Sequence, residues 1–378
     1  MNAAASAPGR GMLRGLFVGS FAVLGSTVPF LATFLRERGV NGGTFVFVMA
    51  ALPLGRMLVG PWAGTLADTR GLTRTALRFG AGLALVGATG MLLELSTGTL
   101  VASVLVFSVG VAPVGPLVDS LALSFLRDQP AQYGSLRGWG SGGYLLASFG
   151  VGWWVDLSDG SPFWASLVAL CLVFACAMGL PAPERPDAQD RSEDGASLDP
   201  LLIPLLLAGG LHFGVHVACS ALLDVHLQSI GLPSRWTGTA IACGVLVEIG
   251  VMSRAAWWLP RLGARRVFVA VLFLAAVRWW AMTGVASPLE VVAVQSMHGV
   301  TFGAFWVAAV ALVDRRSGPA RRARGQAALS GAVAGGGALF GLAGGAALVE
   351  ATNTLMLFQV GIGVALLAGC VALFGVRE

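Results

Sequence analysis

The sequence contains no lysine, and charged residues of all kinds occupy only 11% of its 378 positions. Soluble globular proteins carry about 25% charged residues, so this chain does not form an ordinary soluble domain. All 24 of its strongly basic residues are arginines, which we attribute to the coding bias of the source. The net charge of +5 is too diffuse along the chain to indicate nucleic-acid binding.

Cysteine is also scarce: there are five, an odd number, and all lie in apolar runs. This pattern fits packing side chains better than a disulfide framework, so no redox chemistry is indicated. The first apolar run is too long for a signal-peptide core and lacks a clear cleavage site, so we keep it as a span. No metal cluster, nucleophile triad or phosphate loop is visible, and we therefore predict neither an enzyme nor a cofactor.

Hydrophobic residues, in contrast, make up 56% of the sequence and occur in long runs. A helix of about 20 apolar residues is long enough to cross the hydrocarbon core of a bilayer. We therefore predict an all-α polytopic membrane protein that lies in the lipid bilayer. The twelve predicted spans are residues 12–35, 43–66, 75–95, 98–123, 139–156, 161–181, 200–226, 236–259, 266–284, 289–313, 323–348 and 352–375.

The longest polar stretch follows the sixth span and predicts a division of the chain into two halves. The predicted domains are an N-terminal six-helix bundle over residues 1–181, a cytoplasmic linker over 182–199 and a C-terminal six-helix bundle over 200–378. Arginines are far more frequent in the segments on the linker side, which places both termini in the cytoplasm. We expect a monomer in the inner membrane.

The two halves contain a repeated loop. Gly71 and Arg74 follow the second span, and Gly263 and Arg266 follow the eighth, at equivalent places in each half. A duplicated six-span unit is typical of alternating-access transporters, whose halves rock about a site near the membrane midplane.

The first loop reads Gly64-Thr-Leu-Ala-Asp68-Thr-Arg-Gly71-Leu-Thr-Arg74, which resembles the G-x-L-a-D-x-x-G-x-x-R signature of the major facilitator superfamily. The resemblance implies two pseudo-symmetric six-helix bundles, the major facilitator fold. Asp68 would then act in gating, by accepting hydrogen bonds from the start of a facing helix or by pairing with an arginine. A solvated turn with one acid is the alternative. The predicted gating residues are Gly64, Asp68, Gly71, Arg74 and Arg137.

A narrower resemblance extends over nearly the whole chain. Its segments are Tyr133–Ser141, Val247–Ile249, Arg278–Trp279, Gln295–Gly303 and Gly325–Gln326. They look like the phenylpropionate permease branch of that superfamily, which is similar to the lactose permease group of proton symporters. The resemblance implies proton-coupled uptake of a small organic solute such as an aromatic or carboxylic acid, a sugar or a nucleoside.

The chain departs from that branch at two positions. Cys219 and Ser220 follow His216 where the branch often has a tyrosine pair, and Trp306 stands where it often has a second histidine.

Polar side chains in the middle of three predicted spans indicate a functional site. Gln295, His298, Phe302 and Phe305 are spaced by three or four residues, so they share one helix face. In hydrocarbon, such polar groups are costly unless they face protein or a water-filled cavity. A buried histidine that is merely hydrogen-bonded to a neighbouring helix is the alternative.

Glu248 falls near the centre of the eighth span and is the first choice for the proton carrier. A carboxyl group in a low dielectric holds its proton more tightly, and a nearby cation reverses this, as a carrier that loads and unloads a proton requires. We assign proton coupling to Glu248, His298 and Arg278, with Asp119 as the next candidate. Structural ion pairs of Glu248 with Arg278 and of Asp119 with Arg137 are the alternatives.

His212 and His216 lie four residues apart, which is the spacing of a zinc pair, but no third ligand follows them at a suitable place. We predict instead that they form a hydrogen-bonding wall of a polar cavity, with packing as the alternative. Arg56, midway along the second span, has no partner that the sequence assigns, and we expect it either to hold a substrate anion or to cap a carbonyl. The predicted substrate-binding residues are His216, His212, Gln295, Phe302, Trp306 and Arg56.

Two other functions stay open on this sequence. A buried acid would equally serve an exporter of apolar compounds driven by proton antiport, and a non-transporting membrane receptor or scaffold would have the same spans.

Overall fold

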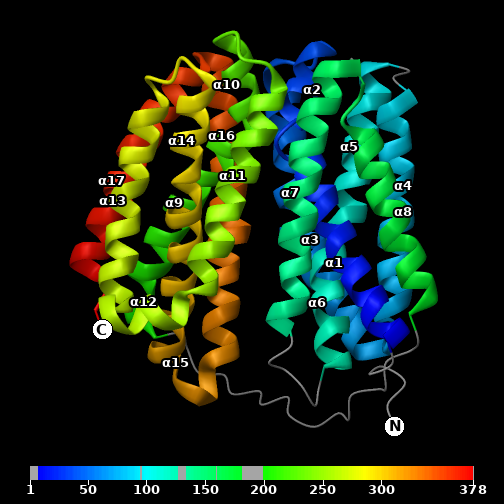
Figure 1. Ribbon diagram of the computed structural model, residues 1–378. Coiled ribbons are helices and arrows are strands. Elements are labelled where there is room, and N and C mark those ends of the chain that lie inside the picture. Colours follow the sequence, from blue (N-terminus) through cyan, green and yellow to red (C-terminus); the bar gives the residue numbers. More distant parts are fainter. Residues whose placement is uncertain (1–6, 94–95, 127–132, 159, 181–198, 378) are drawn as a thin grey trace. The chain divides into compact units, whose positions relative to one another are not determined.

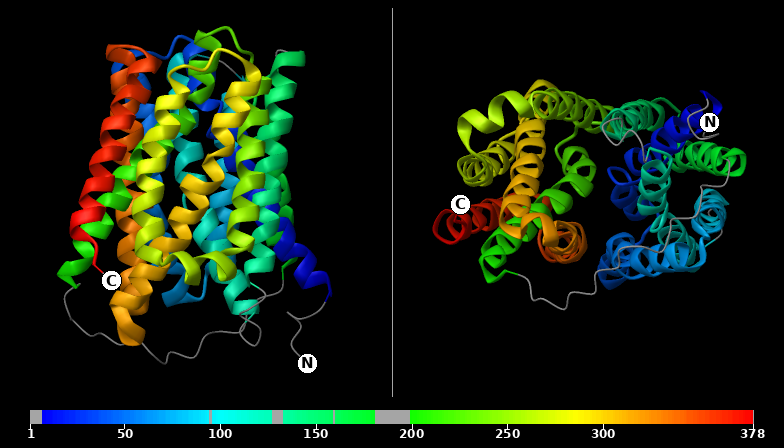
Figure 2. Two further views of the ribbon diagram at one scale, coloured as in Figure 1. Left: turned by 60° about the vertical axis from the view of Figure 1, so that its left-hand side comes forward. Right: turned by 90° about the horizontal axis from the view of Figure 1, so that it is seen from below.

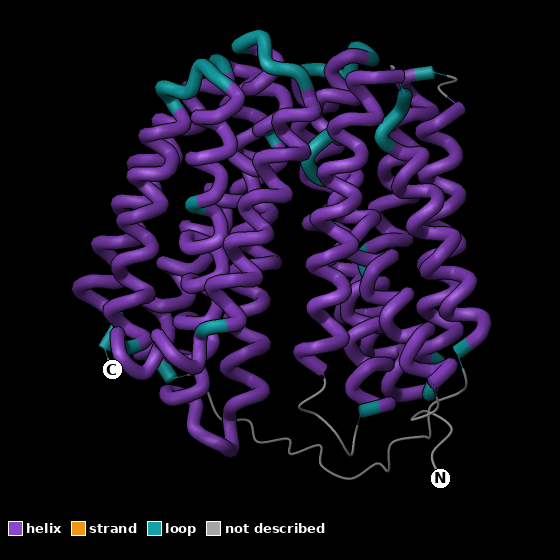
Figure 3. The backbone as a smooth tube through the Cα atoms, in the orientation of Figure 1, coloured by secondary structure: helices purple, strands orange, loops and turns teal. Residues whose placement is uncertain are grey.

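The structure is a computed structural model that describes residues 7–93, 96–126, 133–158, 160–180 and 199–377, with the backbone alone for residues 7–8, 66–70 and 318–323. The described residues form helices joined by turns and loops, without a strand (Figure 1, Figure 3). The helices are α1 (Ala7–Thr27), α2 (Leu31–Glu37), α3 (Gly42–Arg70), α4 (Thr73–Leu93), α5 (Thr97–Val111), α6 (Val114–Phe125), α7 (Tyr133–Ser158), α8 (Phe163–Gly179), η3 (Pro200–Leu202), α9 (Ile203–Ala221), α10 (Leu223–Ser229), α11 (Ser234–Ser253), α12 (Ala255–Leu262), α13 (Ala264–Met282), α14 (Pro288–Ser296), η4 (Gly299–Ala304), α15 (Phe305–Ser330), η5 (Gly331–Gly337), α16 (Ala338–Ala351) and α17 (Thr354–Gly375).

The chain divides into two compact units. One comprises Met1–Val40 and Leu54–Gly195, and the other comprises Asn41–Pro53 and Ala196–Glu378. In the first unit α1 packs on α7 and α8, and α4 packs on α5; in the second, α17 packs on α9 and α13, and α11 packs on α14 (Figure 2). The predicted linker lies almost wholly outside the described residues, so the domain boundaries at 181 and 200 stay a prediction.

The all-α prediction is confirmed, and every predicted span coincides with described helices. Within the described residues, eight helices are long and apolar enough to cross a membrane, or nine if the bent pair Gly9–Thr27 and Leu31–Glu37 is one span. The predicted spans not among these fall on α7, α8 and α13. Of these, α8 is short, at 17 residues, and α13 carries three arginines, Arg265, Arg266 and Arg278.

Several spans are interrupted where the sequence predicted regular helices. The fourth span is interrupted at a proline, because α5 ends at Val111 and Pro113 is the N-cap of α6. The tenth and eleventh spans contain the π-helices η4 and η5, which were not predicted. The gap between the tenth and eleventh predicted spans, residues 314–322, is not a loop, because helical backbone continues through it in α15.

The repeated loop has the same backbone signature in both halves. Gly71 between α3 and α4 has a φ of 66°, and Gly263 between α12 and α13 has a φ of 81°. Side chains with a Cβ rarely adopt this left-handed conformation, so glycine suits both positions. The two loops therefore share a glycine with positive φ at the equivalent place.

Candidate functional site

The predicted acid and histidine of the second unit meet directly. Glu248 comes from α11, and His298 from the turn between α14 and η4. His298 Nε2 lies 3.3 Å from Glu248 Oε2, and their side chains are 17% and 14% exposed. Since a carboxylate only accepts hydrogen bonds, Nε2 carries the hydrogen when Glu248 is ionised. The pair can therefore hold one proton in either of two places.

A glycine makes this contact possible. A Cβ built on Gly299 would lie 2.4 Å from the backbone nitrogen of Glu248, closer than real side chains ever approach. Gly303, one turn further along, leaves only 3.2 Å between such a Cβ and Glu248 Cγ. The absence of side chains on this face of η4 lets the backbone of α11 touch it, which brings the carboxyl group to His298.

Arg278 is fully buried, and its partners are neutral. Its guanidinium donates to Thr301 Oγ1 at 3.1 Å and to Gln295 Oε1, and its Cζ lies 4.3 Å from the centre of the Trp279 ring. The interpretation of Glu248 and Arg278 as a structural ion pair is therefore wrong: among the described interactions, Glu248 contacts His298 instead. Thr301 Oγ1 passes the hydrogen bond on to the Met297 carbonyl at 3.0 Å.

This arrangement leaves a cation in the interior of the second unit without a carboxylate partner among the described ion pairs. A buried charge is costly unless it is paired or well hydrogen-bonded. Arg278 Nε is buried and has no hydrogen-bond partner in the described residues. A negative charge close to Arg278 would therefore be stabilised by it.

Rings surround the pair. The His298 ring stacks on Phe302 with centres 5.1 Å apart and planes at 10°, and the His216 ring lies 4.9 Å from that of His298. Phe302 and Trp306 are parallel within 1°, with centres 6.4 Å apart. Both are only partly buried, as is Phe213 of α9, which lies 6.2 Å from Phe302. These rings form a flat apolar wall beside the polar groups.

His212 binds a backbone carbonyl group. Its Nε2 contacts the Thr301 carbonyl oxygen at 3.0 Å, and because a carbonyl only accepts, this nitrogen donates. The side chain is 2% exposed and packs 4.5 Å from the Phe305 ring. The contact favours a role in holding α9 to η4.

The π-helix η4 changes the predicted face of the tenth span. Phe305 was expected beside His298 and Phe302, but it packs on His212 and Phe268 in the core, at ring distances of 4.5 and 5.6 Å. A π-helix inserts an extra residue into the turn and so rotates the residues after it about the helix axis. Only its two glycines, Gly299 and Gly303, could have suggested the break.

In the first unit, Asp119 of α6 is held by two residues of α7. Arg137 Nη1 lies 3.2 Å from Asp119 Oδ1, and the Tyr133 hydroxyl donates to the same oxygen at 2.8 Å. Arg137 also lies over the Phe21 ring at 5.5 Å. The geometry favours the alternative in which Asp119 is a structural ion-pair partner of Arg137. We therefore do not propose Asp119 as a proton-coupling residue.

The remaining predicted residues also lie in the first unit. Arg56 is on α3 with an exposed side chain, and Gly64 faces open space, since nothing lies within 4 Å of a Cβ built there. Arg74 is half-buried near the start of α4. Asp68 falls in α3, but its side chain lies outside the described residues, so its gating role stays a prediction, as do those of Gly64, Gly71, Arg74 and Arg137.

A second polar cluster was missed in the sequence. Asp224 of α10 is 1% exposed and accepts hydrogen bonds from Thr237 at 2.7 Å and Ser234 at 3.1 Å. His226 Nδ1 lies 2.9 Å from Thr354 Oγ1. The sequence signal for this cluster was Asp224 and His226, two polar residues at the end of the predicted span 200–226. Their contacts join α10 to α11 and α17.

Comparison with known proteins gives consistent matches. The model of the MFS_1 like family matches residues 12–360. The chain is 30% identical to a maltose permease of Geobacillus stearothermophilus over 276 residues, 69% of this chain and 68% of the relative. It is 26% identical to a probable 3-phenylpropionic acid transporter of Escherichia coli (strain K12) over 312 residues, 79% and 80% of the two chains.

The fold also matches solved structures. A mutant of the nucleoside transporter NupG superposes with a TM-score of 0.82 at 14% identity. The superposition covers 97% of this chain and 100% of that chain. At this identity the likeness shows the fold alone, and it confirms the predicted architecture of two six-helix bundles.

Proposed function

Since this chain belongs to the MFS_1 like family of major facilitator superfamily transporters, we propose that it couples the uptake of a small organic solute to protons by alternating access. The observation that carries the proposal is the contact between Glu248 and His298 at 3.3 Å beside the buried cation Arg278. Ionisable groups inside a membrane are costly and mark ion or substrate pathways.

The two groups supply what a symporter needs. Glu248 takes up a proton together with substrate, and His298 accepts a hydrogen bond from the neutral acid or donates one to the carboxylate. The two side chains are partly exposed, so protons and solute can reach them. Phe302 and Trp306 offer the solute an apolar surface, and Arg278 attracts negative charge on it.

The proposed substrate is an aromatic or carboxylic acid, a sugar or a nucleoside. These classes suit a site with a flat wall of aromatic rings and the cation Arg278 nearby. His216 and Gln295 line the same cluster and are the proposed hydrogen-bonding groups. Arg56, in the other unit, is proposed as a further contact for an anionic group. The arginine distribution supports an inner-membrane protein with both termini in the cytoplasm.

One experiment tests the coupling. The purified protein is reconstituted into liposomes that contain a pH-sensitive dye, and members of a solute panel are added outside without a proton gradient. Symport makes the lumen more acidic with one or more solutes. Alkalinisation of the lumen would instead identify the antiporter, and solute binding without any flux of solute or protons would identify a receptor.

A further inference from the structure

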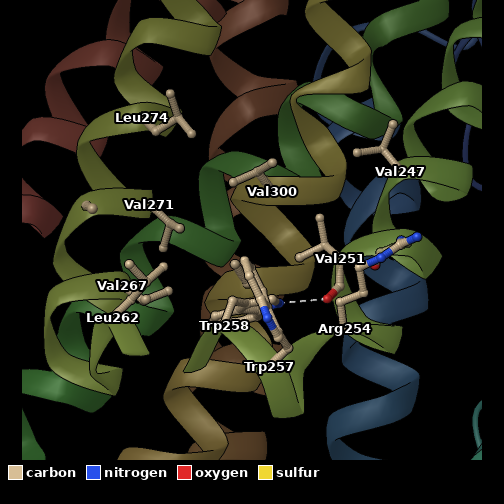
Figure 4. Close-up of a pocket in the computed structure, with 13 residues that line it drawn as sticks. Val247, Val251, Arg254, Trp257, Trp258, Leu262, Val267, Val271, Leu274 and Val300 are labelled. Atoms are coloured by element: carbon tan, nitrogen blue, oxygen red, sulfur yellow. Dashed lines mark hydrogen bonds between the residues drawn. The ribbon is translucent and has the colours of Figure 1, made fainter. Parts of the chain in front are cut away.

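A cavity lies in the second unit among apolar side chains. Its volume is about 740 Å³, within the range of roughly 300–1,000 Å³ that small-molecule sites occupy. Its walls come from four helical segments, α11, α12, α13 and η4 (Figure 4). The lining side chains include Val247, Arg254, Trp257, Leu262, Ala270 and Val300. No predicted substrate or proton residue lines it.

A cationic side chain stands at the edge of this cavity. Arg254 follows the last residue of α11, Ser253, and within the described part of the chain its exposed guanidinium donates to the carbonyl of Gly250 alone, at 3.3 Å. None of the described ion pairs involves Arg254. In Figure 4 it lies on the opposite side of the cavity from Leu262. The apolar interior therefore ends at a charge that is available to a ligand.

The short helix α12 has the character of a membrane-interface element. None of its residues is buried: Trp257 is 63% and Leu262 is 53% exposed. Arg261 Cζ lies 4.7 Å from the Trp257 ring. Within this unit, α12 lies at the same end as the C terminus (Figure 1). Tryptophan and arginine together are enriched at the level of lipid headgroups.

The charge of this region has one sign. Between Glu248 and Glu290 the sequence contains no acidic residue, whereas it contains the arginines Arg254, Arg261, Arg265, Arg266 and Arg278. Basic residues near the cytoplasmic surface attract anionic lipids. An acidic ligand is therefore favoured over a zwitterionic one.

We propose that this cavity binds an acyl chain of one anionic phospholipid from the cytoplasmic leaflet, with its headgroup phosphate at Arg254. The cavity holds the apolar chain, Arg254 holds the phosphate, and Trp257 lies at the depth of the headgroup. Val300 belongs to η4, the segment that follows His298, so the bound chain touches the helix that carries the proposed transport site.

Native mass spectrometry tests the site. The full-length protein in detergent is mixed with phosphatidylglycerol or with phosphatidylcholine of the same acyl chains, and the fraction with one bound lipid is counted. The wild type should favour phosphatidylglycerol by about fivefold, the effect of one basic residue at an anionic surface. Arg254→Ala should bind the two lipids equally. Ala270→Trp, which fills the cavity from α13, should lose the bound lipid of either kind.

Two matched variants serve as controls. Arg377→Ala removes an exposed arginine that lies outside that run of arginines and does not line the cavity, and Val277→Trp places a tryptophan at a 50% exposed position two turns along α13. Both should bind lipid as the wild type does. Lipid retained in Ala270→Trp, or an unchanged preference for phosphatidylglycerol in Arg254→Ala, would overturn the proposal. Loss of lipid in Val277→Trp as well would show that bulk on α13, not the cavity, is responsible.

Discussion

Glu248 and His298 are 50 residues apart in the sequence, yet the carboxylate oxygen of one lies 3.3 Å from the ring nitrogen of the other. Neither is sealed in the core, since about a sixth of each side chain is exposed. Arg278, in contrast, is completely buried and bound to neutral groups. The site thus separates a fixed cation from a pair that can exchange a proton.

Glu248→Gln should abolish accumulation of substrate against a gradient while exchange across the membrane stays measurable. Exchange needs only the loaded carrier to change face, whereas net uptake requires the empty carrier to release its proton and reorient. The amide keeps the shape and cannot titrate. We expect accumulation to fall by at least about tenfold, which corresponds to about 1.4 kcal/mol. Radiolabelled uptake and counterflow in proteoliposomes measure the two activities.

The matched control for that variant is Glu290→Gln. Glu290 caps the exposed start of α14 and lies in the same half of the protein. It should accumulate substrate normally. Accumulation by Glu248→Gln under a proton gradient would show that Glu248 is not the carrier, and loss of exchange as well would point to a structural role.

Gly299→Ala should separate α11 from η4 and weaken transport. The new Cβ would come within 2.4 Å of backbone, which cannot move as a flexible side chain can. Overpacking of this kind costs about 1–3 kcal/mol of stability. Gly344→Ala in α16 meets nothing within 4 Å and should leave the melting temperature unchanged or raise it. Equal melting temperatures and full transport in both variants would show that the close approach is dispensable.

Gln295→Leu should destabilise the protein by about 1–3 kcal/mol, because it removes an acceptor from the buried Arg278. Ser296→Ala is the control, since that hydroxyl donates within its own helix to the Val292 carbonyl at 2.8 Å. Thermal unfolding in detergent compares the two. If both variants have the melting temperature of the wild type, stable burial of the Arg278 cation does not depend on Gln295.

Cysteine labelling tests the orientation. After replacement of the exposed native Cys171 and Cys370, single cysteines at Gly231 and Ser287 should react with an impermeant reagent from outside in intact cells. A cysteine at Ser192 should react only after permeabilisation. The opposite pattern would reverse the orientation inferred from the arginines.

The sequence did not determine which residues pair across helices, and three residues of the site show why. Glu248, His298 and Arg278 could be identified as unusual because each interrupts an apolar run. Which of them pair depends on how α11, α13 and the tenth span are rotated about their axes. That rotation is set by Gly299 and by the π-helix η4, and neither leaves a periodic signal in the sequence.

The membrane class, the positions of the spans and the family followed from the sequence by itself, because hydropathy and loop motifs such as Gly64–Arg74 are local properties of the chain. The tertiary structure alone decided that Glu248 faces His298, that Arg278 is held by Gln295 and Thr301, and that Asp119 is bound to Arg137. Each of these contacts joins different helices, and a close approach between two backbones selects one partner among several that helical spacing allows.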